Sequence, residues 1–206
     1  MKRMKHNRSA SAAIALMLAT LLLWPAGTLA QLGSTVTGQA TAAQVTVLGL
    51  LGTATTTTLG STGISAANAE SDVGQVTGSV PSLLGAEVLN AATYSYSNEV
   101  DSMASLANVG LTVAGISISA DSVTSQASQV LGAAGSGTST ITNLAINGVP
   151  VTADGTPNQT VAIPGGQMTL NEQTISSTGS VVVNAVHVVV NGVADVVLAS
   201  ATAGIS

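Results

Sequence analysis

The chain has 206 residues, a formal net charge of −5, 46% hydrophobic and only 6% charged residues, and no cysteine. The absence of cysteine excludes disulfides and thiolate metal ligands. The low charge density argues against ordinary disorder, which usually combines high charge with low hydrophobicity. All four Lys and Arg residues lie within the first eight positions, whereas the nine acids lie between Glu70 and Asp195. Beyond Arg8 the chain repels DNA, RNA and anionic lipid, so we expect no nucleic-acid partner.

The first 30 residues predict a secretory signal peptide. Basic residues 1–8 precede an apolar run at 12–24 and a small-residue tail at 25–30, which is the three-part order of such signals. The apolar run is shorter than the ~20 residues that a membrane-spanning helix needs, so we expect cleavage before Gln31 and not a retained anchor. Cleavage leaves residues 31–206 as a single exported domain, with no later segment long and apolar enough to span a membrane.

The exported region is predicted to be all-β. Phenylalanine is absent and Trp24 belongs to the signal, so Tyr94 and Tyr96 are the only aromatic residues after residue 30. A core of Val, Ile, Leu and Ala buries little area per side chain, which favours thin, closely packed β-layers. No segment after the signal shows a sustained 3.6-residue apolar period, so we expect little helix.

A weak repeat runs through the middle of the chain. Gly85, Gly115 and Gly148 lie in similar apolar surroundings, 30 and 33 residues apart. Periods near 30 are typical of stacked supersecondary units, so we favour a β-solenoid-like stack closed by a C-terminal β-hairpin. A β-sandwich is the alternative, and antiparallel pairing through residues 80–155 would exclude the solenoid.

Two Asn-Gly pairs predict β-hairpins. Asn147-Gly148 and Asn191-Gly192 lie between apolar segments, and Asn-Gly tolerates the positive φ angles of a two-residue type I′ turn. In residues 181–190, before the second pair, both alternating sets of positions are mostly apolar. This pattern indicates burial on both faces and a central place for the C-terminal hairpin.

The last third of the chain contains short motifs in a fixed order, namely NGVPV (147–151), PNQT (157–160), MTLNEQT (168–174), VNAVHV (183–188) and DVVLASA (195–201). In this order they resemble the choice-of-anchor P family of exported bacterial proteins, over a region from about Val45 to the C-terminus. The resemblance implies an extracellular β-rich domain, with no reaction and no catalytic residues. The family name refers to differing C-terminal anchors. This chain ends soon after the motifs, so we expect release or non-covalent retention at the envelope.

Two acidic pairs are the candidate metal ligands, Glu70 with Asp72 and Glu99 with Asp101. Ca²⁺ takes six to eight oxygen ligands, so these pairs would form a calcium site only if the fold brings them together. The alternative is that they are solvated charges that discourage pairing between sheet edges. We expect no cofactor other than this Ca²⁺.

His187 is the only histidine after residue 30 and lies among valines, which is typical of a packed, hydrogen-bonded residue. A two-residue turn at Asn191-Gly192 would place it near residue 196, with Asp195 on the opposite face. A Ser–His–Asp triad needs His187 to reach both a serine and an acid. Glu172 is expected to hydrogen-bond backbone groups at a turn. Tyr94 and Tyr96 share a strand face, as a packing pair or as a ligand platform.

We therefore expect a non-catalytic secreted or cell-surface protein of the structural or extracellular-matrix type. The alternatives are a Ca²⁺-assisted adhesin or other ligand-binding module, and a secreted hydrolase. Convergence of the four candidate acids would favour the adhesin. The expected partners are further copies of the chain, because long Val-rich strands have edges that pair, or components of the cell envelope.

Overall fold

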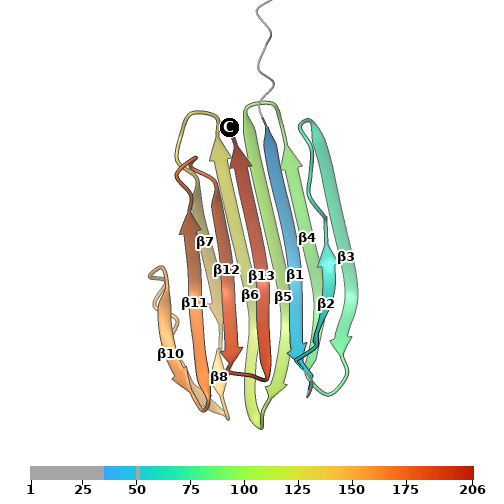
Figure 1. Ribbon diagram of the computed structural model, residues 1–206, viewed down its shortest axis with the longest axis vertical. Helices are drawn as coiled ribbons and strands as arrows, with labels where there is room; N and C mark the ends of the chain where they lie inside the picture. Colours follow the sequence, from blue (N-terminus) through green and yellow to red (C-terminus); the bar gives the residue numbers. More distant parts are fainter. Residues whose placement is uncertain (1–34, 50–51) are drawn as a thin grey trace, which may run out of the picture. The chain divides into compact units, whose positions relative to one another are not determined.

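The computed structural model of the protein describes residues 35–49 and 52–206. The predicted signal peptide, residues 1–30, lies outside the described residues. The described residues form two antiparallel β-sheets that pack face to face as a β-sandwich (Figure 1), which confirms the all-β prediction. No helix among them is long and apolar enough to cross a membrane.

Sheet A has six strands and contains both the beginning and the end of the described chain. Its order is β10 (Gln159–Ile163), β11 (Gly166–Ile175), β12 (Val181–Val190), β13 (Ala194–Ile205), β1 (Val36–Leu48) and β2 (Ala54–Ser61). The C-terminal hairpin β12–β13 lies in the middle of this order, so its predicted central place is confirmed. It is central because β1 pairs with β13 along nearly its whole length.

Sheet B contains the middle of the chain. Its order is β3 (Ala69–Val80), β4 (Leu84–Ser95), β5 (Glu99–Val113), β6 (Ile116–Val130), β8 (Ala145–Ile146) and β9 (Val149–Pro150), and β7 (Ser136–Thr142) also pairs with β6. Strands β7 and β8 follow one another along the same edge of β6 and share one register.

The solenoid-like stack is wrong, and the β-sandwich alternative describes the fold. Every strand pair between residues 69 and 150 is antiparallel. Two copies of the apparent repeat are two-residue hairpin turns with positive φ at both positions, Ala114-Gly115 and Asn147-Gly148. Gly85, in the third copy, lies inside β4. The repeat therefore records recurring turn chemistry and not stacked coils.

A transverse row of residues crosses sheet A at mid-strand, through Asn171, Ala185, Ala199, Ala42 and Gly60. These residues are not paired in the hydrogen-bonded ladders, yet the register between neighbouring strands is the same before and after the row. Three of the five have positive φ, and all five are buried. In a strand that contributes core residues both before and after the row, two consecutive side chains therefore point into the core. Beyond the row, the side chains of that strand still alternate between core and solvent, but odd and even positions have exchanged faces.

This inversion explains the apolar pattern of β12. Val181, Val183 and Ala185 are buried before the inversion, and Val186 and Val188 are buried after it. The prediction that β12 is buried on both faces is therefore wrong, because the core set changes parity within the strand. The side chains between the buried positions remain partly exposed on the outer face.

Sheet B contains a matching row through Val76, Val88, Asn108, Asp121 and Asn143. Here too the ladders skip these positions, but all five residues are exposed. Two acids at this row are held by asparagine amides: the Asn108 amide donates to Glu87 Oε2 at 2.7 Å, and the Asn143 amide donates to Asp121 Oδ2 at 2.6 Å.

Val88 is poorly suited to its place in this row. Its φ is +49° and its side chain is 52% exposed, and a β-branched residue in the left-handed region is strained. Asn108, on the neighbouring strand β5, and Asn143, between β7 and β8, also have positive φ, of 48° and 52°. We expect Val88→Asn to raise the free energy of unfolding by about 1 kcal/mol, measured by urea denaturation. Val76→Asn is the control, because Val76 is also exposed but does not have a positive φ, and it should change stability by less than about 0.5 kcal/mol.

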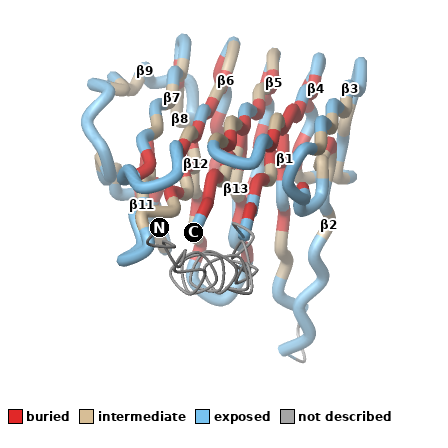
Figure 2. The backbone as a smooth tube through the Cα atoms, turned by 90° about the horizontal axis from the view of Figure 1, so that it is seen from above, coloured by how far each residue is buried: buried red, intermediate tan, exposed pale blue. Residues whose placement is uncertain are grey.

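The core lies between the sheets (Figure 2). It is built mainly from small aliphatic side chains. It forms a large cluster and a smaller one near the end of the sandwich that contains the C-terminus. Ala and Val dominate the smaller cluster, and the two tyrosines belong to neither. Close packing of small side chains, which the composition predicted, is therefore the basis of this fold.

Gln129 at the end of β6 is the main polar group in this core. Its amide oxygen accepts from the Ile205 backbone N–H at 2.9 Å, and its amide nitrogen donates to the carbonyls of Ala133 and Thr178 at 3.0 and 3.3 Å. It thereby joins the C-terminal strand, the β6–β7 loop and the β11–β12 loop.

Candidate functional site

His187 lies on the outer face of sheet A between two carboxylates. Its Nδ1 is 3.0 and 2.9 Å from the two Glu172 carboxylate oxygens, and its Nε2 is 3.0 Å from Asp195 Oδ1. The Asn184 amide donates to Glu172 Oε2 at 2.6 Å. The strands β11, β12 and β13 each contribute to this cluster, which we call the histidine cluster: Glu172, Asn184, His187 and Asp195.

The transverse row assembles one half of the histidine cluster. Because Ala185 and Val186 both point inward, Asn184 and His187 both point outward. Asn184 is opposite Glu172 in the ladder, so the inversion brings His187 within reach of the same carboxylate. The expectation that Glu172 bonds backbone groups at a turn is wrong, since it lies inside β11 and bonds side chains.

The hairpin loop assembles the other half. Val190 pairs with Ala194, so the loop has three residues, Asn191, Gly192 and Val193, and not the predicted two. The additional loop residue shifts the register by one, so that His187 pairs with Val197. Asp195 then lies on the same outer face as His187. The expected opposite orientation of Asp195 is therefore wrong.

The two carboxylates favour the protonated ring of His187. Burial opposes its charge, but the hydrogen bonds and negative charges of Glu172 and Asp195 outweigh this effect and raise the pKa of His187 above 6.5. Both ring nitrogens bond carboxylates, and in the described chain neither bonds a serine hydroxyl. This geometry suits a structural cross-link better than a general base.

The histidine cluster predicts a loss of stability at alkaline pH. A pKa that is raised in the folded state stabilises the fold fully below pH 6.5, and this contribution disappears as the pH rises through the folded-state pKa. We expect the free energy of unfolding to fall by roughly 1 kcal/mol between pH 6 and pH 9. Urea denaturation across this range measures it. In His187→Gln the fall should be absent, and an equal fall in the variant would contradict this assignment.

The four candidate calcium ligands lie at one end of sheet B. In the ladders Glu70 is opposite Tyr94, and Tyr94 is opposite Asp101, so one tyrosine separates the two acids. Asp72 lies two residues further along β3, and Glu99 lies at the start of β5. No three Asp, Glu or His side chains among the described residues are placed to share a metal ion. The calcium site stays a prediction, without a geometry that supports it.

These four acids differ from the other five in their partners. Glu87, Asp121, Asp154, Glu172 and Asp195 all accept hydrogen bonds from described side chains. The carboxylates of Glu70, Asp72, Glu99 and Asp101 have no such partner within the described chain. The acids that are free to meet a ligand are therefore gathered around the tyrosines.

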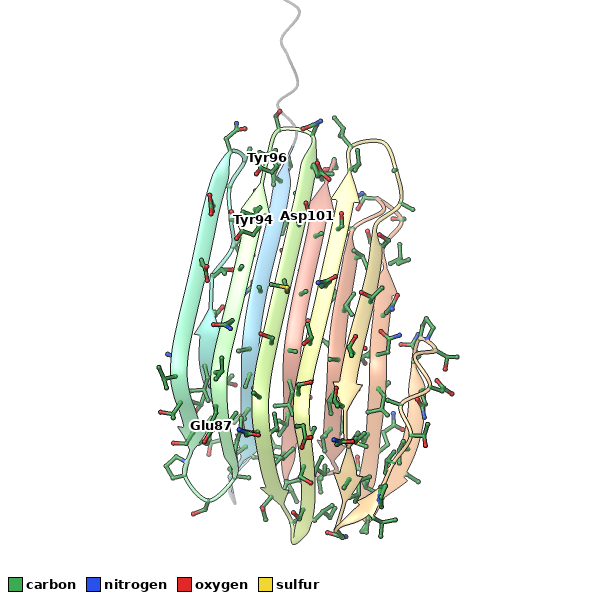
Figure 3. The ribbon with its side chains drawn as sticks, turned by 180° about the vertical axis from the view of Figure 1, so that it is seen from behind. Glu87, Tyr94, Tyr96 and Asp101 are labelled. Carbon is green, nitrogen blue, oxygen red and sulfur yellow. The ribbon has the colours of Figure 1, made fainter. Side chains whose placement is uncertain are left out.

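A shallow groove of about 400 Å³ lies beside Tyr94 on the outer face of sheet B. Figure 3 shows this face, with Tyr94 and Asp101 side by side and Tyr96 nearer the end of the sheet. The groove crosses β4, β5, β6 and β7, and its polar lining residues are Tyr94, Asp101, Ser102, Gln126, Ser128, Ser136 and Thr138. Because Tyr94, Asp101, Ser128 and Ser136 are successive partners in the ladders, they form one row across the strands.

The groove could not be predicted from the sequence. Its signal was the alternation of polar residues in 122–128 and 136–142, which marks the outer faces of two strands. Only the pairing of β6 with β7 brings these two sets together beside Tyr94.

Comparison with protein-family models, curated proteins and solved structures finds no match. The fold and the two surfaces therefore define the protein only as an antiparallel β-sandwich with an anionic outer surface. Its resemblance to the choice-of-anchor P family stays a prediction.

Proposed function

We propose that the protein is a non-catalytic structural component of the cell surface or extracellular matrix. In this proposal it is exported through its N-terminal signal and acts through the outer faces of its β-sandwich. We assign the protein no reaction, because the residue most typical of an enzyme, His187, has both ring nitrogens bound to carboxylates.

The outer face of sheet B is the observation that carries this proposal. Hydroxyl and amide side chains align across four strands, as in the successive ladder partners Asn90, Ser105, Thr124 and Thr140. Lys and Arg are absent from the described residues, so the face carries only negative charge. A broad, hydrated and uniformly anionic strand surface suits contacts with neutral polymers or with other copies, and it discourages binding to phosphate-rich molecules.

Localisation tests the proposal directly. Antibodies against the folded protein should label intact producing cells or the surrounding matrix, and mass spectrometry should find an N-terminus at Gln31. Because Lys and Arg are absent beyond Arg8, the digest requires an endopeptidase that cleaves after glutamate. A protein confined to the cytoplasm with residues 1–30 intact would contradict the proposal.

A second candidate function is a ligand-binding module, which the groove beside Tyr94 favours. The partly exposed ring of Tyr94 offers a stacking surface, and Asp101 and the neighbouring hydroxyls are free to hydrogen-bond a neutral polysaccharide. Electrophoresis through gels that contain such polysaccharides, with and without Ca²⁺, tests this function. Retardation should disappear in Tyr94→Ala and persist in Tyr96→Ala, whose ring lies outside the groove. Retardation that requires Ca²⁺ would favour the adhesin.

A further inference from the structure

The two sheets differ in how well their edges are protected from pairing with another strand. Short strands and prolines are common protective devices. Strand β9 has two residues and ends at Pro150, and β10 has only five residues. Strands β2 and β7 have eight and seven residues.

Strand β3 is the least protected of the edges. It has twelve residues, it keeps one register with β4 on both sides of the skipped position Val76, and no other described strand pairs with its opposite edge. Its charges, Glu70 and Asp72, lie at one end. The remainder, residues 73–80, contains no charge and no proline.

An exposed apolar pair lies in the middle of this open edge. Val76 is 82% exposed, and its place in the register, between Gln75 and Thr77, puts it opposite Val88, which is 52% exposed. A valine this exposed on an open edge strand is a feature that isolated sheets usually avoid.

We propose that β3 pairs antiparallel with β3 of a second copy of this chain, so that sheet B continues across a two-fold axis near Val76. The charges support this direction. Antiparallel pairing places Glu70 and Asp72 of each copy beside the uncharged end of the other β3, whereas parallel pairing would place the acids of the two copies together.

The same geometry limits the assembly to two copies. A two-fold interface uses the same edge on both subunits and closes on itself, so it does not propagate into a fibre. One strand pair also forms a small interface, and the dimer should therefore be weak and concentration-dependent. This inference needs only the β3 edge, and it holds whether or not the protein belongs to a matrix.

Multi-angle light scattering over a concentration series tests the pairing. The purified wild-type protein should shift from monomer to dimer as its concentration rises. Val76→Lys brings two like charges together at the axis and should raise the dimer dissociation constant by at least about tenfold. Val149→Lys is the matched control, because Val149 is an exposed valine on the short edge strand β9 of the same sheet, and it should dimerise like the wild type.

Cysteine cross-linking provides a second measurement, because the chain contains no cysteine of its own. Val76→Cys should form a disulfide-linked dimer under mild oxidation, and Val149→Cys should not. Circular dichroism verifies that each variant is folded. A wild-type protein that stays monomeric at its highest soluble concentration would overturn the inference. So would equal association of Val76→Lys, or cross-linking through Val149→Cys alone.

Discussion

Replacing Gln129 by leucine should lower the free energy of unfolding by about 3 kcal/mol. Leucine is close to glutamine in size, so the change removes hydrogen bonds without leaving a large cavity. Gln129 is only 2% exposed, and water cannot easily take its place. The substitution leaves the Ile205 N–H without its partner and removes the donor to two loop carbonyls. Urea denaturation gives the difference.

Gln126→Leu is the matched control for this prediction. It lies three residues earlier on β6, but on the exposed outer face, and within the described chain its amide hydrogen-bonds only the Met103 sulfur, at 3.5 Å. Its effect should stay within about 0.5 kcal/mol. Hydrogen exchange adds a local measurement, since the Ile205 amide should exchange faster in Gln129→Leu alone. A loss below about 1 kcal/mol in that variant would show that the three bonds contribute little net stability.

Gly166→Ala should destabilise the protein by about 3 kcal/mol or more. A Cβ at this first position of β11 would run into the carbonyl oxygen and carbon of Val189 on β12. These are backbone atoms in the ladder where Gly166 pairs with Val190, so the clash is relieved only if the two strands separate. Chemical denaturation measures the loss.

Gly85→Ala is the control for this substitution. Gly85 also lies in a strand, but a Cβ there would meet nothing within 4 Å, and its φ is not positive. Alanine at such a position restricts the unfolded chain and should stabilise by about 0.5 kcal/mol. If both variants lost similar stability, the cost would belong to glycine replacement in strands generally, and the predicted clash at Val189 would be wrong.

The composition and the Asn-Gly pairs predicted the strand content and the hairpins, because turn chemistry and apolar runs are local signals. They could not predict the architecture. Ala114-Gly115 and Asn147-Gly148 look like a repeat along the chain, yet similar turns occur wherever antiparallel strands connect. A solenoid and a sandwich differ in which strands pair, and this depends on contacts between residues far apart in sequence.

The histidine cluster shows why site prediction fell short. The sequence indicates His187, Asp195 and Glu172 only as single residues of interest. Their convergence depends on one additional loop residue, Val193, and on the parity change at Ala185, and neither is visible in an apolar pattern. By contrast, the four acids that the sequence offered as candidate calcium ligands, Glu70, Asp72, Glu99 and Asp101, lie at one end of sheet B but form no metal-ion cage in the described chain.

The transverse rows also bear on how this chain avoids misfolded isomers. Its strands are assembled from few residue types, so neighbouring strands could slide past one another at little cost in side-chain packing. A one-residue slide exposes the core set in any sheet. A two-residue slide normally keeps every side chain on its proper face, but here it would move the inversion of one strand out of line with that of the next. Apolar residues beside Ala42 or Ala199 would then point to solvent. The inversions therefore disfavour the two-residue slide, which strands with simple alternation would accept without exposing their core residues.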